Sequence, residues 1–515
     1  MAPMLRMLPV AVIALALAGC ETPVPQVLGP EHVPSNFSAP TARSATVWPS
    51  PRWWSGFNSP DLDTLVATAQ KNNLDVAAAA ARVMQAEAQA DISGAALYPT
   101  LSVDGTAQRS RTGAGGVPHA RPLTANDFGL SLEASYQLDL WGRARAGLRA
   151  ADQLVLASTY AQEVVALTVT ADVANAYLDI LALRQRIAIA RHNADAARRI
   201  LKVVQVRVTN GVSSRLDLAQ QEAQLASVEA TIPALQEQER EARYTLAILL
   251  GRLPEGFDVQ GDRLDRIVAP QVAPGLPSEL LRRRPDIAEA EANLASAHAN
   301  LDAARAAFFP QIGLTGSTGF NSATIGSMFG GPAFGWSIGA SLLQTIFDGG
   351  LLQGQLDLNK DQQQELIATY RSTVLNAFSD VETTLGQVSS LADQEILRTK
   401  QADASAEAFK ISELQYREGT TDLLNLLTAQ ETLFTAQDQL VQIKLARLQS
   451  DVGLYQALGG GWSEAAEAAT QTIPVGTTPV EAGPPATPPP AASGIPATPG
   501  PMAIPKPSQD SATRH

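Results

Sequence analysis

Residues 293–320 read NLASAHANLDAARAAFFPQIGLTGSTGF, and they contain the pattern from which the architecture can be predicted. Its first half is rich in alanine and predicts a helix, which must end near Phe309 because Pro310 follows. After the proline, apolar residues alternate with small or polar ones from Ile312 to Phe320, which is typical of a strand with one apolar face. The stretch therefore joins a helix directly to a strand.

The same plan occurs earlier in the chain. Residues 82–108 read RVMQAEAQADISGAALYPTLSVDGTAQ, and their Pro99 stands 211 residues before Pro310. Residues 210–217 (NGVSSRLD) match residues 418–425 (EGTTDLLN) at an offset of 208. Chance similarity between two alanine-rich helices would not place the proline and glycine landmarks at a near-constant offset, so we infer an internal duplication.

The duplication divides the chain into parts. We expect a signal peptide, a lipidated N-terminal extension, a first repeat, a second repeat and a disordered tail rich in proline and alanine, at residues 1–19, 20–60, 61–258, 259–460 and 461–515.

Strand patterns with a period of two occur at residues 101–108, 128–139, 312–320 and 336–342. Segments of about ten residues with one apolar face suit membrane-spanning strands, although a half-buried sheet of a soluble protein has the same pattern. The stretches Ser110–Asp127 and Asn321–Gly335, rich in glycine and polar residues, are expected to be loops.

About four strands are too few to close a membrane barrel within one chain. The smallest such barrels have about eight strands, and an open sheet edge cannot face lipid because its backbone groups would lack hydrogen-bond partners. If these strands cross a membrane, several chains must share one barrel. The sequence therefore predicts an oligomer.

The first repeat also contains an unusually long helical segment. Residues 146–208 contain no proline and no glycine beyond Gly147, and from Val169 to Val208 apolar residues recur at alternating steps of four and three. This heptad pattern is typical of helices that coil on neighbours. At about 1.5 Å per residue, the helix would be on the order of 90 Å long. Gly211 predicts its end, and residues 216–250 predict a return helix.

The second repeat shows the same pattern. Apolar residues form a stripe from Val374 to Ile396, Gly419 marks a turn, and residues 423–458 predict a return helix. Helices of this length suit a coiled coil or the wall of a helical tube.

The N-terminus has the features of an export signal. Arg6 is its only charge, and an apolar run follows that is too short to span a bilayer. Leu17-Ala-Gly-Cys20 resembles a bacterial lipobox, which implies that Cys20 becomes the first mature residue and carries S-diacylglycerol and N-palmitoyl lipid. A plain secretory signal with an incidental cysteine is the alternative. Glu21 stands where an aspartate would favour the inner membrane, so we expect the outer membrane.

Charge and motifs argue against other classes of protein. The formal charge is −13 and no basic run stands out, so a nucleic-acid surface is not expected. After the signal, no stretch approaches 18 uninterrupted apolar residues. The five histidines show no metal-ligand spacing, and no G-x-S-x-G motif occurs, so we expect neither a metal site nor an enzyme. Arg282–Arg284 are expected at a helix start rather than at a phosphate site, because Pro285 and Asp286 follow.

Motifs spread along the chain resemble those of the TolC-type outer-membrane efflux proteins, in their NodT or OprM-like lipoprotein branch. The resemblance covers about residues 20 to 460, and the 275–287 stretch is the most specific. The matching segments are WWSGF at 53–57, PDL at 60–62, NLD at 73–75, LDLWGR at 138–143, IPAL at 232–235, LLG at 249–251, GLPSELLRRRPDI at 275–287, FDGG at 347–350 and YREG at 416–419.

This resemblance implies an α+β membrane protein and a homotrimer. Three chains would share one β-barrel of about twelve strands in the outer membrane, continued by a long periplasmic α-helical barrel. The channel would meet a periplasmic adaptor and an inner-membrane pump of the resistance-nodulation-division type. It would pass small molecules such as drugs to the outside and catalyse nothing. A TolC-type channel for type I protein secretion and a structural coiled-coil lipoprotein of the envelope are the alternatives.

The resemblance also implies where the channel closes and docks. An apolar ring at the inner end falls on Leu424, and the acidic position one turn on falls on Thr428, which departs from the family pattern. Asp422 and Asp217 lie nearby and would supply the charge instead, although solvated carboxylates at helix ends are the simpler interpretation. The hairpin tips expected to contact the adaptor are Asn210, Gly211, Glu418 and Gly419.

Overall fold

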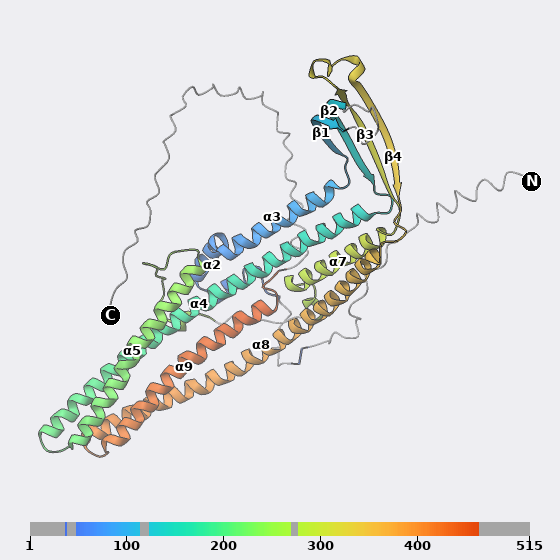
Figure 1. The fold of residues 1–515 in the computed structure, drawn as a ribbon. Helices are drawn as coiled ribbons and strands as arrows, with labels where there is room; N and C mark the ends of the chain where they lie inside the picture. Colours follow the sequence, from blue (N-terminus) through green and yellow to red (C-terminus); the bar gives the residue numbers. More distant parts are fainter. Residues whose placement is uncertain (1–36, 39–47, 114–122, 269–276, 463–515) are drawn as a thin grey trace, which may run out of the picture. The chain divides into compact units, whose positions relative to one another are not determined.

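The computed structural model describes residues 37–38, 48–113, 123–268 and 277–462, all within one compact unit, Met1–Ala466 (Figure 1). Cys20, the signal peptide and residues 463–515 lie outside the described residues. The order of helix, strand pair and long helical hairpin occurs twice along the chain, as the duplication predicted.

The first repeat opens with short helices whose starts are readable in the sequence. The 3-10 helix η2 (Trp53–Phe57) leads into α2 (Pro60–Asn72) and α3 (Leu74–Ala95). The Ser59 hydroxyl caps α2 by accepting a hydrogen bond from the Leu62 N–H, and Pro60 occupies the first helical turn.

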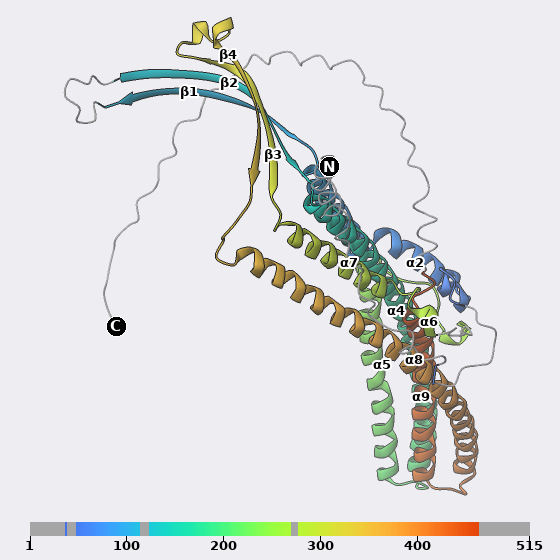
Figure 2. The same cartoon turned by 90° about the vertical axis from the view of Figure 1, so that its right-hand side faces the viewer.

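The strands form one antiparallel sheet in the order β1-β2-β3-β4 (Figure 2). Their bounds are β1 Thr100–Thr112, β2 Leu123–Leu138, β3 Gln311–Ser322 and β4 Phe334–Leu343. The predicted loops were too long: β1 and β2 continue into Ser110–Asp127, where the cross-strand pairs Ser110–Ala125 and Arg111–Thr124 extend the ladder. The stretch Asn321–Gly335 contains the short 3-10 helices η4 (Ile325–Ser327) and η5 (Gly331–Ala333).

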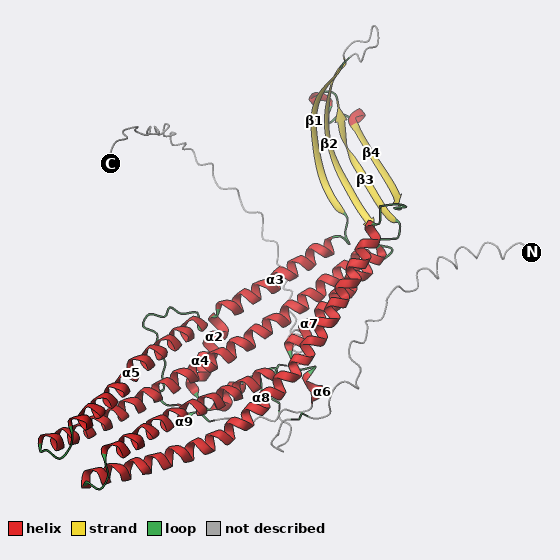
Figure 3. Cartoon of the chain, turned by 60° about the horizontal axis from the view of Figure 1, so that its bottom comes forward, coloured by secondary structure: helices red, strands yellow, loops and turns green. Residues whose placement is uncertain are grey.

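Two helices of 67 and 68 residues, α4 (Arg143–Thr209) and α8 (Leu351–Glu418), leave the strands. Each turns back through a shorter helix of 35 residues, α5 (Arg215–Leu249) and α9 (Leu423–Ala457), to form two long hairpins (Figure 3). At about 1.5 Å per residue, α4 and α8 are each roughly 100 Å long.

The predicted seams are mostly buried. The stripe on α4 is buried at Val169, Val173 and Ile180, among others, because α5, α7 and α9 pack against this helix. The stripe on α8 is buried at Val374 and Val381 but not at its end, since Ile396 is 56% exposed in the single chain.

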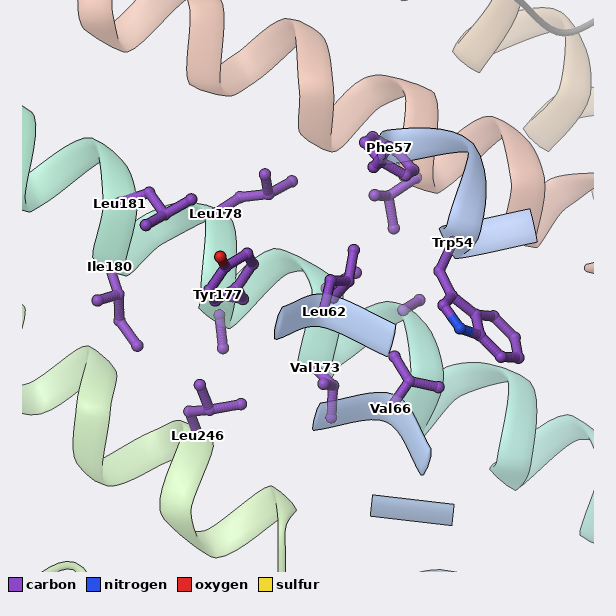
Figure 4. Packing of buried hydrophobic residues seen from close by; sticks show 14 of the residues in the cluster. Trp54, Phe57, Leu62, Val66, Val173, Tyr177, Leu178, Ile180, Leu181 and Leu246 are labelled. Atoms are coloured by element: carbon purple, nitrogen blue, oxygen red, sulfur yellow. The ribbon is translucent and has the colours of Figure 1, made fainter. Parts of the chain in front are cut away.

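The main core joins the N-terminal segment to the helical body (Figure 4). Residues 53–57, predicted to belong to an N-terminal extension, lie inside it: Phe57 is fully buried, and the Trp53 ring stacks on Tyr455 of α9 at 5.0 Å. Each large apolar side chain buried in this way contributes about 1.5–3 kcal/mol. Leu178 of α4 and Leu246 of α5 complete the contact.

The arginine run begins a helix, as expected. The short helix α6 (Pro277–Leu280) precedes α7 (Pro285–Ala306), and Pro285 occupies the first turn of α7. The Arg284 guanidinium is largely buried and forms ion pairs with Asp286 at 2.7 Å and with Asp380 of α8 at 3.2 Å. It therefore ties α7 to α8.

The chain remains packed two residues beyond the predicted start of the tail. Gly459, Gly460 and Gly461 have positive φ, and a Cβ on Gly459 would lie 1.9 Å from the Arg283 carbonyl oxygen. The Trp462 ring then lies edge-on to Tyr160 of α4 at 5.7 Å. Residues 461 and 462 thus belong to the body, which corrects the boundary at residue 461.

Among the described residues, α4 is the one helix long and apolar enough to cross a membrane. However, 56% of its most apolar stretch is buried inside the chain. Its composition follows from its place in the core, where apolar residues surround it.

Candidate functional site

The two hairpin tips lie side by side (Figures 1 and 3). A cluster of buried apolar residues joins them, drawn from the ends of α4 and α8 and the start of α9, and consists of Ile200, Val204, Tyr416, Leu423 and Leu426. The predicted docking and gating residues of the two repeats therefore share one end of the helical body.

The first tip is a tight turn closed by a capping box. Asn210 follows the last residue of α4, and Gly211 has φ +71°, a conformation that glycine adopts without steric cost. The Ser214 hydroxyl accepts from the Asp217 N–H at 3.1 Å, while the Asp217 carboxylate accepts from the Ser214 N–H at 2.9 Å. Asp217 thus serves as a helix cap.

The second tip repeats this arrangement with a different cap. Glu418 is the last residue of α8, and Gly419 has φ +76°. The Asp422 carboxylate accepts from the Asn425 N–H at 2.9 Å at the start of α9. Asp422 is therefore also a helix cap.

Two of the predicted gate residues, Leu424 and Thr428, lie in the first turns of α9. Leu424 is 62% exposed, and the Thr428 hydroxyl donates to the Leu424 carbonyl oxygen at 2.9 Å. No hydrogen bond or ion pair joins Asp217 to Asp422 in the described part of the chain. A ring of these side chains needs further copies, so the gate assignment stays a prediction.

A contact that the sequence did not reveal fastens the two hairpins together. The Arg207 guanidinium of α4 lies over the Tyr416 ring of α8 at 4.7 Å and donates a hydrogen bond to the Tyr416 carbonyl oxygen. Tyr416 is only 3% exposed. We call this pair the tip clamp. Tyr416 belongs to the YREG motif, but its partner 209 residues away gives no sequence signal.

Beside the tips, a groove separates α5 from α9. Its volume is about 760 Å³, and its walls include Asn193, Gln224, Thr231, Phe434 and Gln442. Arg186 of α4 and Asp438 of α9 join across it through two hydrogen bonds, at 2.6 and 3.1 Å. The groove is open and its lining mixes polar and apolar side chains, which suits a helical partner.

The sheet has two chemically different faces. In an antiparallel sheet directly opposed residues point to the same side. One side is apolar, with Leu101, Val103, Trp336 and Ile338 each at least 69% exposed in the single chain. The other side carries small and hydroxyl residues together with the acids Asp104, Asp127 and Glu133.

A buried carboxyl group lies in the helical body. Asp451 of α9 is 3% exposed, and one of its oxygens lacks a hydrogen-bond partner. Burial raises the pKa of Asp451 to about 7; Arg447 lowers it and Glu395 raises it further. Arg447 is already paired with Glu395 at 2.6 Å, so its charge is largely compensated.

We predict that this carboxyl makes the protein less stable at high pH. Its folded pKa of about 7 exceeds the unfolded value of about 3.9, so the folded state binds more protons between these values. The contribution of Asp451 to the free energy of unfolding should therefore fall as pH rises from about 4 to 7. Asp451→Asn should remove this contribution and stabilise each chain at pH 8 by about 1–3 kcal/mol.

Thermal denaturation followed by circular dichroism at pH 5 and pH 8 tests this expectation. Asp393→Asn, at an exposed position of α8, is the matched control and should leave the pH dependence unchanged. Equal pH dependence in the wild type and in Asp451→Asn would show that Asp451 is not the titrating group.

The described residues contain no group of three or more His, Cys, Asp or Glu side chains placed to hold a metal ion. His298 contacts Gln363 of α8 at 3.1 Å, a side-chain contact within the helical body.

Comparisons with known proteins agree with this geometry. The family model "Outer membrane efflux protein" matches residues 65–252 and 276–460, one match in each repeat. The chain is 41% identical over 416 residues to the pyoverdine export outer membrane protein OpmQ of Pseudomonas aeruginosa, covering 80% of this chain and 87% of that one. It is 32% identical over 483 residues to the antibiotic efflux pump outer membrane protein ArpC of Pseudomonas putida, covering 92% and 99%.

A solved structure has the same fold. The open-state MtrE outer membrane channel of Neisseria gonorrhoeae superposes with a TM-score of 0.77 at 31% identity, covering 86% of this chain and 97% of that chain. The long hairpins, the strand pairs and the matched segments lead to one conclusion: this chain belongs to the outer membrane efflux protein family and is an outer-membrane efflux channel.

Proposed function

We propose that three copies of this chain form one channel that receives small molecules from an inner-membrane pump through a periplasmic adaptor. The observation that carries the proposal is the open sheet: β1 and β4 are both edge strands, and one face is apolar and exposed. Such edges are stable in lipid only when another chain pairs with them. Three chains would supply about twelve strands, enough for a closed barrel.

The hairpin end is the proposed contact for the adaptor. The tips at Asn210–Gly211 and Glu418–Gly419 are exposed, and the groove between α5 and α9 opens beside them. A periplasmic adaptor that presents helical hairpins would find matching helical surfaces here. The pump, proposed to be of the resistance-nodulation-division type, would supply the energy, and the channel itself would carry out no chemistry.

The proposed cargo is small molecules. The names of two relatives specify export of pyoverdine and of antibiotics, which are small compounds. The polar sheet face, with its hydroxyl groups and acids, supports a wet path of mixed polarity. Nothing in the described residues favours a polypeptide as cargo over these compounds.

Dye accumulation in living cells tests the proposed function. Cells that lack this protein and its redundant channels, but keep the cognate pump and adaptor, should accumulate a fluorescent pump substrate several-fold above the wild type. A plasmid copy should restore efflux. Unchanged accumulation would refute the proposal, and loss of a secreted protein from the medium with normal dye efflux would point to type I secretion.

We further propose that Cys20 carries the lipid anchor. Its lone thiol follows a lipobox-like Leu17-Ala-Gly. Cys20→Ser should abolish incorporation of labelled palmitate. Because the barrel also holds the protein in the membrane, membrane association should fall only partly. Retained label would contradict lipidation, and full release into the soluble fraction would contradict the barrel.

A further inference from the structure

The charged residues of the four strands are sorted by sign between the two faces of the sheet. The acids Asp104, Asp127 and Glu133 all lie on the polar face, and β3 and β4 contain no charged residue. The two basic residues, Arg109 and Arg111, lie on the opposite face, because they alternate in register with Leu101, Val103 and Ala107 on β1. The apolar face therefore carries positive charge at one end and no negative charge.

The two arginines lie just beyond the apolar band. On this face the band runs from the Leu138–Ile312 pair to the Phe128–Ala107 pair, ten residues apart along β2. At about 3.3 Å per residue and a strand tilt of about 40°, this distance corresponds to roughly 25 Å along the membrane normal, the height of the apolar band in such barrels. Arg109 is two residues beyond Ala107 on the same face of β1, which places it roughly 5 Å farther along the membrane normal.

That level is the headgroup region of the bilayer. The headgroups extend several ångströms beyond each side of the hydrocarbon core. Aromatic rings mark the same boundary: Phe320 contacts Phe334 at 5.6 Å and Phe329 at 5.5 Å. Aromatic girdles are typical of the two interfaces of an outer-membrane barrel.

The neighbours of the arginines leave their charge uncompensated on this face. Arg109 is opposed by Asn126 and Arg111 by Thr124, both neutral, and both arginines are exposed. The Cα atoms of residues at alternate positions of one strand lie about 7 Å apart, so both guanidinium groups can reach one or two phosphate groups.

We infer that Arg109 and Arg111 bind phosphorylated lipid headgroups of the outer leaflet of the outer membrane, of the lipid A kind. The inference rests on the proposed function, which places the helices in the periplasm and the β1–β2 hairpin at the cell exterior. Arg109 and Arg111 lie near the Thr112 end of β1, and this end of the strand points away from the helices (Figure 2). In the assembled trimer, the pair would occur three times around the barrel.

Binding of lipid A to the purified, full-length detergent-solubilised channel tests this inference. Native mass spectrometry counts the bound lipid, with bisphosphorylated lipid A and fully dephosphorylated lipid A as probes. The wild type should retain the phosphorylated form, and the double variant Arg109→Gln/Arg111→Gln should bind it at least about tenfold more weakly, because charge-assisted hydrogen bonds are lost. The dephosphorylated form should bind weakly to both proteins.

Matched variants separate charge from structure. Arg109→Lys/Arg111→Lys keeps both charges and should stay within a few-fold of the wild type, and Arg82→Gln, an exposed arginine on α3, should have no effect. Equal binding by the wild type and the double glutamine variant, or equal binding of both lipids, would overturn the inference. Displacement of lipid A by a large excess of inorganic phosphate would identify a free-anion site instead and would also overturn it.

Particle mass and dye efflux distinguish this result from a failure of the proposed function. Suppose the double glutamine variant forms the same particle as the wild type and restores dye efflux. Equal lipid A binding by the two proteins would then contradict the role of the arginines and leave the proposed function intact. If the wild type itself forms no oligomer, the proposed function fails before the lipid test begins.

Discussion

A channel that carries Arg207→Ala is expected to leak at its closed end, with a closed-state conductance at least about tenfold above that of the wild type. The tip clamp is a contact between hairpins, since Arg207 belongs to α4 and Tyr416 to α8. A cation over an aromatic ring contributes about 0.5–2 kcal/mol, and a hydrogen bond from a charged group about 1.5–3 kcal/mol. For a contact made in the closed state alone, as this prediction takes the clamp to be, loss of even 1.4 kcal/mol changes the ratio of closed to open states about tenfold.

Conductance in planar bilayers measures the leak of the purified channel directly. In whole cells, a leaking channel should increase sensitivity to a large glycopeptide antibiotic, which otherwise does not pass the outer membrane. Tyr416→Phe is the matched control, because it keeps the ring and the carbonyl oxygen while removing a hydroxyl that has no hydrogen-bond partner among the described atoms. The Tyr416→Phe channel should keep the low closed-state conductance of the wild type. If the Arg207→Ala channel also kept that low conductance, the clamp would not be what holds the closed state.

The open channel is expected to prefer cations over anions. The polar face of the sheet carries Asp104, Asp127 and Glu133 and no basic residue, so three chains would place about nine carboxylates around the exit. Rings of acidic side chains attract cations and repel anions, and the effect persists where the pore is not much wider than the screening length of about 10 Å at 0.1 M salt. The wild-type ratio of potassium to chloride permeability should exceed 1 several-fold.

Neutral replacement of all three acids, Asp104→Asn, Asp127→Asn and Glu133→Gln, should bring that ratio close to 1. Reversal potentials in a salt gradient give the ratio for each protein. Arg109→Gln/Arg111→Gln, which alters charge on the other face, is the control and should keep the wild-type preference. An anion-selective wild type, or a triple variant with unchanged selectivity, would show that this face does not line the path.

The long helices could be predicted because each carries a local, repeated signal. The seam of α4 recurs over twelve positions that other helices of the same chain cover, so its pattern and its burial agree. The seam of α8 agrees only up to Ala392, and Ile396 is exposed because no helix of the same chain covers it. An apolar stripe in the sequence predicts that a helix surface is buried. It does not show whether the partner helix belongs to the same chain or to another copy.

The strand ends were missed for a related reason. Alternation of apolar and polar residues marks a strand only where one face meets an apolar environment. Beyond Ala107 the same face carries Arg109 and Arg111, so the pattern stops although the backbone pairing continues to Thr112. The polar ends of these strands therefore resemble loops in the sequence.

The helix caps at the hairpin tips could be predicted from the sequence, but the contacts between the two repeats could not. Ser214 and Asp217 form a capping box whose spacing is visible in the sequence. Arg207 and Tyr416 meet only because two hairpins fold side by side, and Asp451 is one acid among many on a long helix. Their roles depend on neighbours far along the chain, which a single sequence does not specify.

The most direct test of the channel assembly is the protein mass of the detergent-extracted particle, measured by light scattering with the detergent and lipid contributions subtracted. One chain has a mass of 54.3 kDa, so three chains without their signal peptides should give roughly 155 kDa. That mass would support a barrel shared by three chains. A stable monomer of about 52 kDa would leave β1 and β4 unpaired in lipid and would contradict the proposed channel.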